Sequence, residues 1–375
     1  MRFAKLAVQM LVDVPFKSLG TLLGVFVSAF LMLQELSSLE GLLTRVAAVP
    51  DTAEVDMWIA SKATESIGAT DSVPESRVGA AAGTPGVAWA APVLIGMGRV
   101  TRPDGVRECV SVLGVQAPRY AGLPSKLAAG TTPDSLRGSS RILLNDNDRP
   151  SFGAAVPGDR LEINGRTAIV SGFFEGMDPH APCFYFYANI DDARAMTDFP
   201  EGRVTFIALG LERGASEKEV KRRLAARIAD VAIFSRKELH DAEVRYFLVR
   251  TPAGLFFGVA VAIAAIVGGV FVAVTLYSMV IDRMRDYGML KAVGARNRDL
   301  LRLLLFQAWT FAVVGYASGL GCFLVMRQTV TALRMVVTPQ ILIVVAVVSI
   351  TTCTLASYAA IRRVLSLDPA SIFRG

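Results

Sequence analysis

Residues 253–281, AGLFFGVAVAIAAIVGGVFVAVTLYSMVI, lie within the longest run of the chain that contains no Asp, Glu, Lys or Arg. A helix rises about 1.5 Å per residue, so roughly 20 apolar residues are needed to cross the hydrocarbon core of a bilayer. Residues 253–281 therefore predict a transmembrane helix. Three other apolar segments, 16–36, 300–325 and 338–360, predict further spans, and the first of them is the least apolar.

The charges of the chain are divided unevenly between its parts. Of 375 residues, 53% are hydrophobic, yet 39 are Lys or Arg and 33 are Asp or Glu. Residues 37–250 hold 25 basic and 27 acidic residues, a net charge of −2, which leaves +8 for the apolar segments and their flanks. Basic residues beside apolar segments are typical of membrane proteins, whereas nucleic-acid binding favours one basic soluble surface. We therefore expect no nucleic-acid partner.

Basic residues in short flanks mark the cytoplasmic side of a membrane protein. Three groups of them fall on one side if both termini are cytoplasmic: Arg2, Lys5 and Lys17; Arg283, Arg285, Lys291, Arg296, Arg298 and Arg302; and Arg362, Arg363 and Arg374. The region 37–250 is then extracytoplasmic. A cleavable signal peptide is the alternative for the first span, but Asp13, Pro15 and Lys17 fit a signal poorly. We favour an uncleaved anchor whose helix continues through the polar stretch 34–45.

The region 37–250 has the pattern of a mixed α/β domain. Strand-like runs occur at 55–60, 87–100, 106–115, 160–163, 167–174 and 204–211. Asn164-Gly165 suits the positive φ angles of a tight hairpin between two of these runs. Ser216 and Ser235, each followed by Glu three residues later, predict capping boxes for two helices. The second helix leads toward Pro252, which either starts a new helix or kinks a continuing one, so we expect a helical stalk at the membrane.

Few residues offer catalytic or metal-binding chemistry. The chain contains no GxxxxGK[ST], HExxH or GxSxG motif, so we expect no nucleotide site and no enzyme activity. The four cysteines show no CxxC spacing, which excludes a typical zinc site. Cys109 and Cys183 could pair in an exported domain, but two free buried thiols are the favoured interpretation. Gln307 is predicted to make a helix-to-helix hydrogen bond rather than a substrate contact.

The second and third apolar segments are joined by Asp282-Arg-Met-Arg-Asp-Tyr-Gly-Met-Leu-Lys-Ala-Val-Gly-Ala295, which is too polar for lipid. Met289, Leu290 and Val293 predict a small apolar ridge on a short helix along the membrane face. Gly288 and Gly294 are expected to allow a tight reversal at each end of it. From spacing alone, such a segment is either a docking helix for a partner or a solvated loop whose basic residues satisfy topology.

This segment resembles the loop between the second and third spans of FtsX/MacB-type ABC transporter permeases, and DevC-like permeases are the nearest in likeness. The likeness continues in Gly158-DRLEIN-Gly165, Val170-SGF-Phe174, Tyr187-ANIDDA-Arg194, Phe234-SRKE-Leu239 and the tail Ala360-IRRVLSLDP-Ala370. It thus covers most of the chain. The resemblance implies an integral membrane α-helical protein with four transmembrane helices, and a large α+β extracytoplasmic domain inserted between helices 1 and 2.

The domain order implied by sequence and resemblance together has eight parts. They are an N-terminal segment with transmembrane helix 1 (1–36), a periplasmic α+β domain with a helical stalk (37–250), transmembrane helix 2 (251–281), a cytoplasmic coupling segment (282–299), transmembrane helix 3 (300–325), a short periplasmic loop (326–337), transmembrane helix 4 (338–360) and a cytoplasmic tail (361–375). The resemblance places the protein in the bacterial inner membrane, with both termini cytoplasmic.

The resemblance also implies the function of the loop. It implies mechanotransmission, in which a separate ATPase, present in two copies and binding ATP and Mg²⁺ itself, pulls on a permease homodimer. The residues implied to contact the ATPase are Arg283, Arg285, Asp286, Tyr287, Gly288, Leu290, Lys291, Gly294, Ala295, Leu367, Asp368 and Pro369. A periplasmic adaptor, a TolC-like outer-membrane channel, membrane lipid and a glycolipid or other amphiphilic cargo complete the expectation for a DevC-like exporter.

Two alternatives stay open from the sequence. One is a lipoprotein-release or cell-division permease of the same superfamily, and the other is a membrane receptor or sensor that works without an ATPase. Neither the cargo nor the dimer interface is specified by any motif in the chain.

Overall fold

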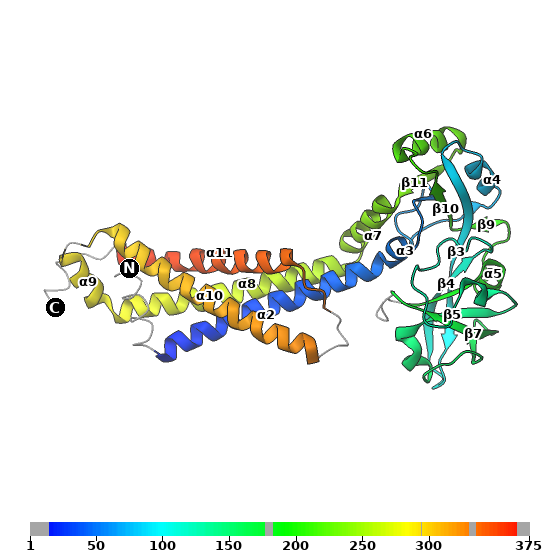
Figure 1. Ribbon diagram of the computed structural model, residues 1–375. Coiled ribbons are helices and arrows are strands. Elements are labelled where there is room, and N and C mark those ends of the chain that lie inside the picture. The colour runs from blue at the N-terminus through cyan, green and yellow to red at the C-terminus, as the bar shows by residue number, and fades with distance from the viewer. Residues whose placement is uncertain (1–14, 177–182, 294, 330–334, 366–375) are drawn as a thin grey trace. The chain divides into compact units, whose positions relative to one another are not determined.

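The computed structural model describes residues 15–176, 183–293, 295–329 and 335–365. By its contacts the chain divides into two compact units, one of Met1–Gly41 with Pro252–Gly375 and one of Leu42–Thr251. The first is built from helices and the second from a mixed β-sheet with helices (Figure 1).

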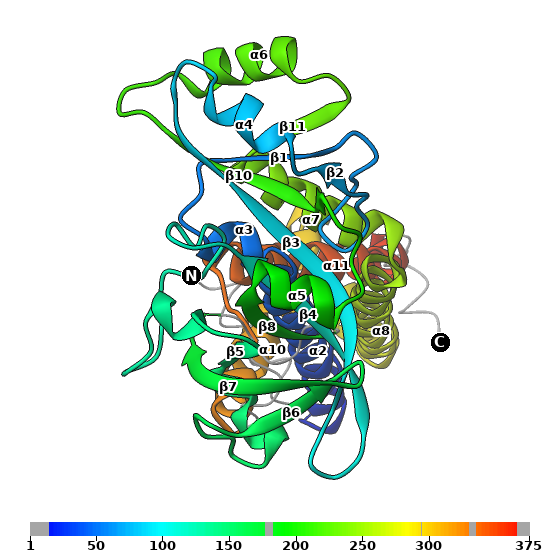
Figure 2. The ribbon, with the colours of Figure 1, turned by 90° about the vertical axis from the view of Figure 1, so that its right-hand side faces the viewer.

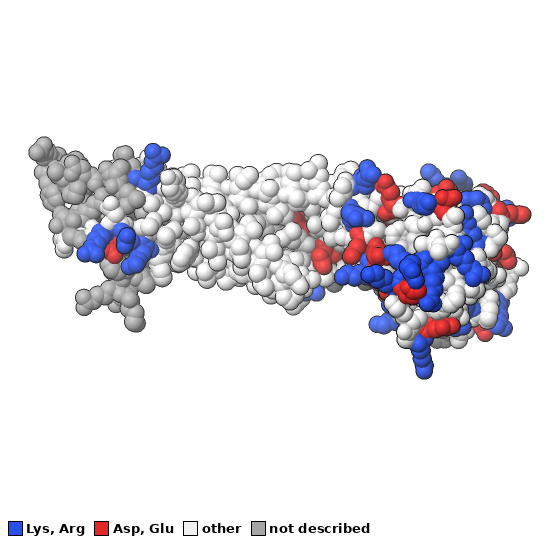
Figure 3. Space-filling model, turned by 90° about the horizontal axis from the view of Figure 1, so that it is seen from above, with Lys and Arg blue, Asp and Glu red and all other residues white. Residues whose placement is uncertain are grey.

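Four long helices form the helical unit, and each is long and apolar enough to span a membrane. They are α2 (Pro15–Val46), α8 (Pro252–Asp282), α10 (Asn297–Thr329) and α11 (Pro339–Leu365). The spans predicted from hydropathy lie within these helices, except that Thr338 precedes α11, and α2 continues through the polar stretch 34–45 as expected. Figure 3 shows the middle of this unit without charged side chains on the face in view, as lipid contact requires.

Close packing of α10 against α2 depends on two glycines. A Cβ at Gly315 would lie 2.6 Å from the Val25 side chain, and one at Gly319 would lie 3.0 Å from the Phe26 carbonyl oxygen. The Gly315-x-x-x-Gly319 face therefore serves packing within the chain. By contrast, no described atom lies within 4 Å of a Cβ built at Gly258.

A polar contact joins α2 and α8 at one end of the helical unit. Lys17, near the start of α2, forms an ion pair with Asp282 at the end of α8, and its Nζ donates to Ser278 Oγ at 2.7 Å. The first turn of α2 thus lies beside the last turn of α8, so these two helices run in opposite directions.

The sheet unit contains nine paired strands in the order β11-β1-β10-β3-β4-β8-β5-β7-β6, and a separate pair β2-β9. The strands are β1 (Met57–Ser61), β2 (Val73–Pro74), β3 (Val87–Thr101), β4 (Arg107–Val115), β5 (Arg141–Asn145), β6 (Arg160–Ile163), β7 (Arg166–Phe174), β8 (Phe184–Asn189), β9 (Arg203–Val204), β10 (Phe206–Leu211) and β11 (Val231–Ser235). Because β6 also pairs with β3, the strands from β3 to β6 close into a ring. Figure 2 shows the long β3 running through both parts of the sheet.

Short helices cover this sheet. They are α3 (Ala48–Thr52), α4 (Arg77–Ala82), α5 (Ile190–Met196), α6 (Glu217–Arg227) and α7 (Arg236–Arg250), with 3₁₀ turns η1 (Pro133–Leu136) and η2 (Asp146–Phe152). The predicted capping box at Ser235 is formed, whereas the Ser216 side chain makes no cap hydrogen bond, so that prediction was wrong. Pro252 begins α8, because the backbone of Thr251 is extended (φ −103°, ψ 156°).

The predicted hairpin at Asn164-Gly165 is confirmed. Both residues have positive φ, 47° and 78°, and they form the two-residue turn between β6 and β7, since Ile163 pairs with Arg166. The Asn164 amide also donates to the Met196 carbonyl at 2.8 Å, so the side chain fixes the turn to α5. This is the geometry that asparagine-glycine pairs favour.

The cysteine expectation is corrected by the structure. Cys109, in β4, and Cys183, just before β8, are joined in a disulfide, so they are not free thiols. The two cysteines come together because β4 and β8 pair in parallel, with Val110 opposite Phe184. Sequence spacing gave no sign of this pairing, because 74 residues separate them.

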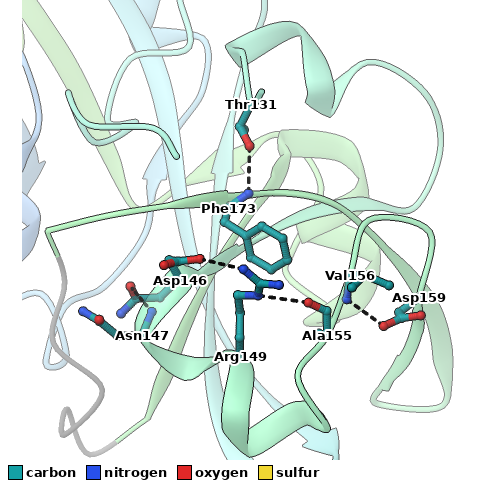
Figure 4. Close-up of polar contacts among 9 residues, drawn as sticks. Thr131, Asp146, Asn147, Arg149, Ala155, Val156, Asp159 and Phe173 are labelled. Carbon is teal, nitrogen blue, oxygen red and sulfur yellow. Dashed lines mark hydrogen bonds and ion pairs between the residues drawn. The ribbon is translucent and has the colours of Figure 1, made fainter. Parts of the chain in front are cut away.

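The loops beside β7 are held by one arginine, Arg149 of η2 (Figure 4). Its guanidinium stacks on the Phe173 ring at 4.4 Å, donates to the Ala155 carbonyl at 3.0 Å and pairs with Asp146 at 3.3 Å. The Phe173 N–H donates in turn to Thr131 Oγ1 at 3.0 Å. These contacts all lie within the sheet unit, so we assign the cluster a structural role.

Candidate coupling segment

The segment between α8 and α10 folds as a separate short helix, α9 (Met284–Ala292). Arg283 forms the turn that precedes it, and the Tyr287 N–H donates to the Arg283 carbonyl at 3.2 Å. Gly288 lies inside α9 rather than at a reversal, which corrects the expectation drawn from the sequence. Glycine is tolerated there, at a cost of about 1 kcal/mol relative to alanine.

Tyr287 anchors α9 to the helical unit. Its side chain is 1% exposed and packs in a cluster with Leu300, Leu303 and Leu304 of α10. Its hydroxyl is hydrogen-bonded to Gln307, which confirms the helix-to-helix hydrogen bond predicted for that glutamine. Burial raises the pKa of Tyr287 to about 12, although nearby Arg283 and the bond with Gln307 act in the opposite direction. The hydroxyl therefore stays neutral and serves as an internal hydrogen-bonding group.

The outward face of α9 differs from the predicted ridge. Leu290 packs inward against the cluster of Tyr287, whereas Met289 is 49% exposed and Val293 is 89% exposed. Arg285 is also exposed, four residues before Met289, so the two lie on the same face of the helix. Among the described side chains of α9, the exposed ones are thus Arg285 and Met289, and we call these two residues the outer face of α9.

Hydrogen bonds fix the angle at which the chain leaves α9. The Ala295 N–H donates to the Leu290 carbonyl at 2.9 Å, the bond that closes a Schellman motif at a helix end. The Arg296 N–H donates to Asp299 Oδ2 at 3.1 Å in the first turn of α10. Both bonds satisfy backbone groups that a helix end leaves unpaired. The described residues on either side of position 294 are thus hydrogen-bonded to the ends of α9 and α10.

The remaining predicted contact residues are placed as follows. Arg283 and Asp286 are half-buried at the inner side of α9, and Ala295 packs against the cluster of Tyr287. The backbone of Lys291 lies in α9, and its side chain lies outside what the structure describes. Gly294, Leu367, Asp368 and Pro369 also lie outside the described residues. The structure thus brings one group of the predicted residues together, with Tyr287 inside rather than at the surface.

Side-chain contacts connect the two segments through which the chain enters and leaves the sheet unit. His240 Nδ1 of α7 lies 3.0 Å from both carboxylate oxygens of Asp51 in α3. Arg236 Nε donates to the Val55 carbonyl at 3.0 Å, just beyond α3. The segment that follows α2 is therefore bound to the helix that precedes α8. Sequence reasoning missed this connection, because no local pattern links residues that are far apart in the chain.

No group of three or more His, Cys, Asp or Glu side chains that could hold a metal ion occurs among the described residues. The α9 segment likewise presents no nucleophile paired with a base. Among the described residues, this segment offers a short helix that packs against α10 on one side and exposes Arg285 and Met289 on the other.

Residues 18–227 match the family model of the MacB-like periplasmic core domain, and residues 258–369 match that of the FtsX-like permease C-terminal region. The chain belongs to the MacB/FtsX family of ABC transporter permeases. The second match includes all of α9 and α10, so the coupling segment lies within the region that defines FtsX-like permeases.

Curated relatives of this permease carry similar names. The chain is 25% identical over 298 residues to the uncharacterized ABC transporter permease Rv2563 of Mycobacterium tuberculosis, covering 78% of this chain and 76% of that protein. It is 23% identical to the uncharacterized ABC transporter permease MJ1507 of Methanocaldococcus jannaschii, covering 57% of each. A shorter match, 33% identical, covers 26% of this chain and 14% of the pyoverdine export ATP-binding/permease protein PvdT of Pseudomonas fluorescens.

Solved structures similar to the permease include two domains from related transporters. One is the periplasmic region of MacB from Actinobacillus actinomycetemcomitans, at 14% identity and a TM-score of 0.39, covering 52% of this chain and 94% of that one. The other is the extracellular domain of the ABC-type transporter YknZ from Gram-positive bacteria, at 14% identity and a TM-score of 0.36, covering 48% and 99%.

Proposed function

We propose that this chain is the permease subunit of an ABC exporter and that it works by mechanotransmission with a separate ATPase. The observation that carries the proposal is the construction of α9. Its inner side is locked to α10 through Tyr287 and Gln307, while Arg285 and Met289 stay free at the surface. Force applied to the outer face of α9 would therefore move α8 and α10 as rigid bodies, since close-packed interiors transmit strain.

The separate ATPase is supported by the sequence of this chain. It contains no GxxxxGK[ST] phosphate-binding loop, while PvdT is named as a protein that contains both ATP-binding and permease parts. An ABC permease without its own nucleotide site needs an ATPase supplied by another chain. We propose two copies of that ATPase on a permease homodimer, with the outer face of α9 as the contact in each half.

We propose that the sheet unit is a periplasmic domain that works with an adaptor and a TolC-like outer-membrane channel. The contacts between α3 and α7 support this proposal, because they bind together the two connections through which the sheet unit would receive movement. The cargo we propose is a glycolipid or other amphiphile, on the resemblance to DevC-like permeases.

The test of ATPase coupling uses one surface substitution with a matched control. Met289→Asp places a charge on the outer face of α9 without touching the Tyr287 cluster. We expect about a tenfold loss of ATPase co-purified with the permease, because burying a Met side chain at an interface contributes about 1.5 kcal/mol or more. Leu290→Asp is less informative, since Leu290 packs inward and its loss would disturb the helical unit itself.

The control is Met97→Asp, which changes a similarly exposed methionine on β3 of the sheet unit. Both variants should reach the membrane in wild-type amounts. Recovery of the ATPase should fall only for Met289→Asp. Equal recovery from the two variants would show that α9 is not the contact, and no ATPase recovered even with the wild type would favour a receptor or sensor.

A further inference from the structure

A groove on α7 has a composition that the coupling mechanism does not use. It is a cavity of about 430 Å³ in the sheet unit, within the usual range for small-ligand sites of roughly 300–1,000 Å³. It is lined by the last turns of α7, by β11 and by the loop that follows β1: Thr64, Glu65, Phe234, Ala242, Arg245, Tyr246, Val249 and Arg250. The lining thus combines aromatic and aliphatic side chains with two guanidinium groups.

The two arginines of the groove are held differently. Arg250 donates to Glu65 Oε1 at 2.9 Å, so its guanidinium is fixed at the rim by a carboxylate of the neighbouring loop. Arg245 is exposed and forms no ion pair with any other residue in the part of the chain that the structure describes. The groove therefore keeps a net positive charge. Guanidinium groups bind phosphate through paired N–H donors, which makes a phosphate the complementary ligand.

The apolar side of the groove is unusual for a water-facing helix. Val249 is 74% exposed, and Arg245 and Tyr246 lie four and three residues before it, on the same face of α7. Arg250 lies four residues after Tyr246 and lines the same groove. Such a mixture of aliphatic, phenolic and basic side chains is typical of residues at the surface of a bilayer. It matches a ligand with a charged head and an apolar body.

The position of the groove in the chain identifies the source of such a ligand. Thr251 alone separates Arg250 from Pro252, the first residue of the apolar helix α8. Two residues span at most about 7 Å, so Arg250 is held that close to the start of a membrane-spanning helix whatever the direction of α7. Phospholipid headgroups are the phosphates found at that level of a membrane protein.

We propose that the α7 groove binds the headgroup of an anionic phospholipid, with the phosphate at Arg245 and Arg250 and the upper part of the lipid against Tyr246 and Val249. This inference needs only that α8 spans the membrane, and it is independent of the ATPase and of the cargo. A bound lipid there would hold the end of α7 at the bilayer surface.

Amide hydrogen exchange of the full-length permease in nanodiscs tests the proposal. One set of nanodiscs contains phosphatidylcholine alone and another contains phosphatidylcholine mixed with phosphatidylglycerol. We expect exchange over residues 242–250 to slow about fivefold in the anionic nanodiscs, which is the factor that one basic side chain gains at an anionic lipid surface. Equal exchange in the two lipids would overturn the proposal.

Arginine variants and added inorganic phosphate test whether the slowed exchange arises from lipid bound in this groove. Arg245→Gln should abolish the slowing over 242–250, Arg245→Lys should keep most of it, and Arg213→Gln, an exposed arginine after β10, should leave it unchanged. Slowing that persists in Arg245→Gln would overturn the assignment to this groove. If inorganic phosphate added to phosphatidylcholine nanodiscs gives the same slowing, the site binds free phosphate and the lipid proposal is wrong.

Discussion

At the scale of single residues, Glu243 is the carboxylate most altered by its surroundings in the sheet unit. It lies on α7, is 3% exposed, and accepts a hydrogen bond from the Ile67 N–H. Burial raises its pKa to about 7, the hydrogen bond from Ile67 acting in the opposite direction, and its charge contributes to the raised pKa of the neighbouring Tyr185. Glu243 thus joins α7 to the loop after β1 through a group that changes charge near neutral pH.

The consequence is a sheet unit that is more stable in mild acid. The pKa of Glu243 is higher folded than its usual 4.5, so the folded state holds a proton that the unfolded state has lost. The stabilisation from protonated Glu243 is complete below about pH 4.5 and is lost as the pH rises through about 7. The loss amounts to up to about 3 kcal/mol, because each unit of pKa difference contributes about 1.4 kcal/mol. Urea unfolding of the full chain, followed by tryptophan fluorescence, should show a urea midpoint that decreases as the pH is raised from 5 to 8.

Glu243→Gln provides the matched control, because its amide oxygen can still accept from Ile67 but cannot ionise. The variant should lose the part of the pH dependence that lies between pH 5 and pH 8. A pH dependence identical to that of the wild type would assign the effect to another group.

At the scale of elements, the helices were easier to predict than the strands. Apolar runs longer than 20 residues specify α8, α10 and α11 directly. β5 and β8 were missed because each has a run of consecutive buried residues, four in β5 and three in β8, so neither shows an alternation of buried and exposed positions. β7, whose face partly meets solvent, was predicted. Tertiary pairing, rather than local sequence, defines the central strands.

Sequence also predicted where α9 lies but not which of its faces is free. A run with apolar residues at 289, 290 and 293 has two candidate faces, and only the packing of Tyr287 against α10 decides between them. In the sequence, Tyr287 resembles any other polar residue of a charged loop, because its hydrogen-bonding partner Gln307 lies on another helix. Gln307 itself was the useful signal, since a buried amide within an apolar helix needs a hydrogen-bonding partner.

The packing of α10 on α2 gives a prediction at this scale. Gly319→Ala would bring a Cβ to 3.0 Å from the Phe26 carbonyl oxygen, so the two backbones must separate, at a cost of about 1–3 kcal/mol. Gly321→Ala is the control on the same helix, because its Cβ would meet no described atom within 4 Å. Alanine is favoured over glycine in helices by about 1 kcal/mol, so this control should be as stable as wild type or more so.

Thermal unfolding of the two variants in the same detergent measures the difference. The midpoint should fall for Gly319→Ala and hold or rise for Gly321→Ala. If Gly319→Ala is as stable as Gly321→Ala, the close contact between α2 and α10 contributes little, and the Gly315-x-x-x-Gly319 face is then available for other helices.

At the scale of the whole molecule, the charge partition of the sequence came close to the observed division. A soluble domain was predicted over 37–250, and the compact sheet unit is Leu42–Thr251. The difference at the first boundary arises because α2 continues to Val46 as one helix, beyond the last strongly apolar residues. The sequence left the pairing of Cys109 with Cys183 as the less favoured alternative, because the disulfide depends on the parallel pairing of β4 with β8.

The disulfide bears on the orientation of the molecule, because such bonds persist in exported domains and are rare in the cytoplasm. It therefore supports the proposal that the sheet unit lies outside the cytoplasmic membrane. The basic residues around α9 support the same orientation from the other end, since positively charged flanks are retained in the cytoplasm. The two arguments rest on different chemistry and agree.

Cysteine labelling tests this orientation at both ends of the molecule. In a background with Cys322 and Cys353 replaced by serine, Ser139→Cys places a thiol on an exposed turn of the sheet unit, and Met289→Cys places one on the outer face of α9. Cys109 and Cys183 do not react while they are joined. An impermeant maleimide added to spheroplasts should label Ser139→Cys at once, and Met289→Cys only after the membrane is ruptured. The reverse pattern would place α9 outside the cell, where no ATP-driven partner could act on it, and would remove the basis of the coupling proposal together with the orientation.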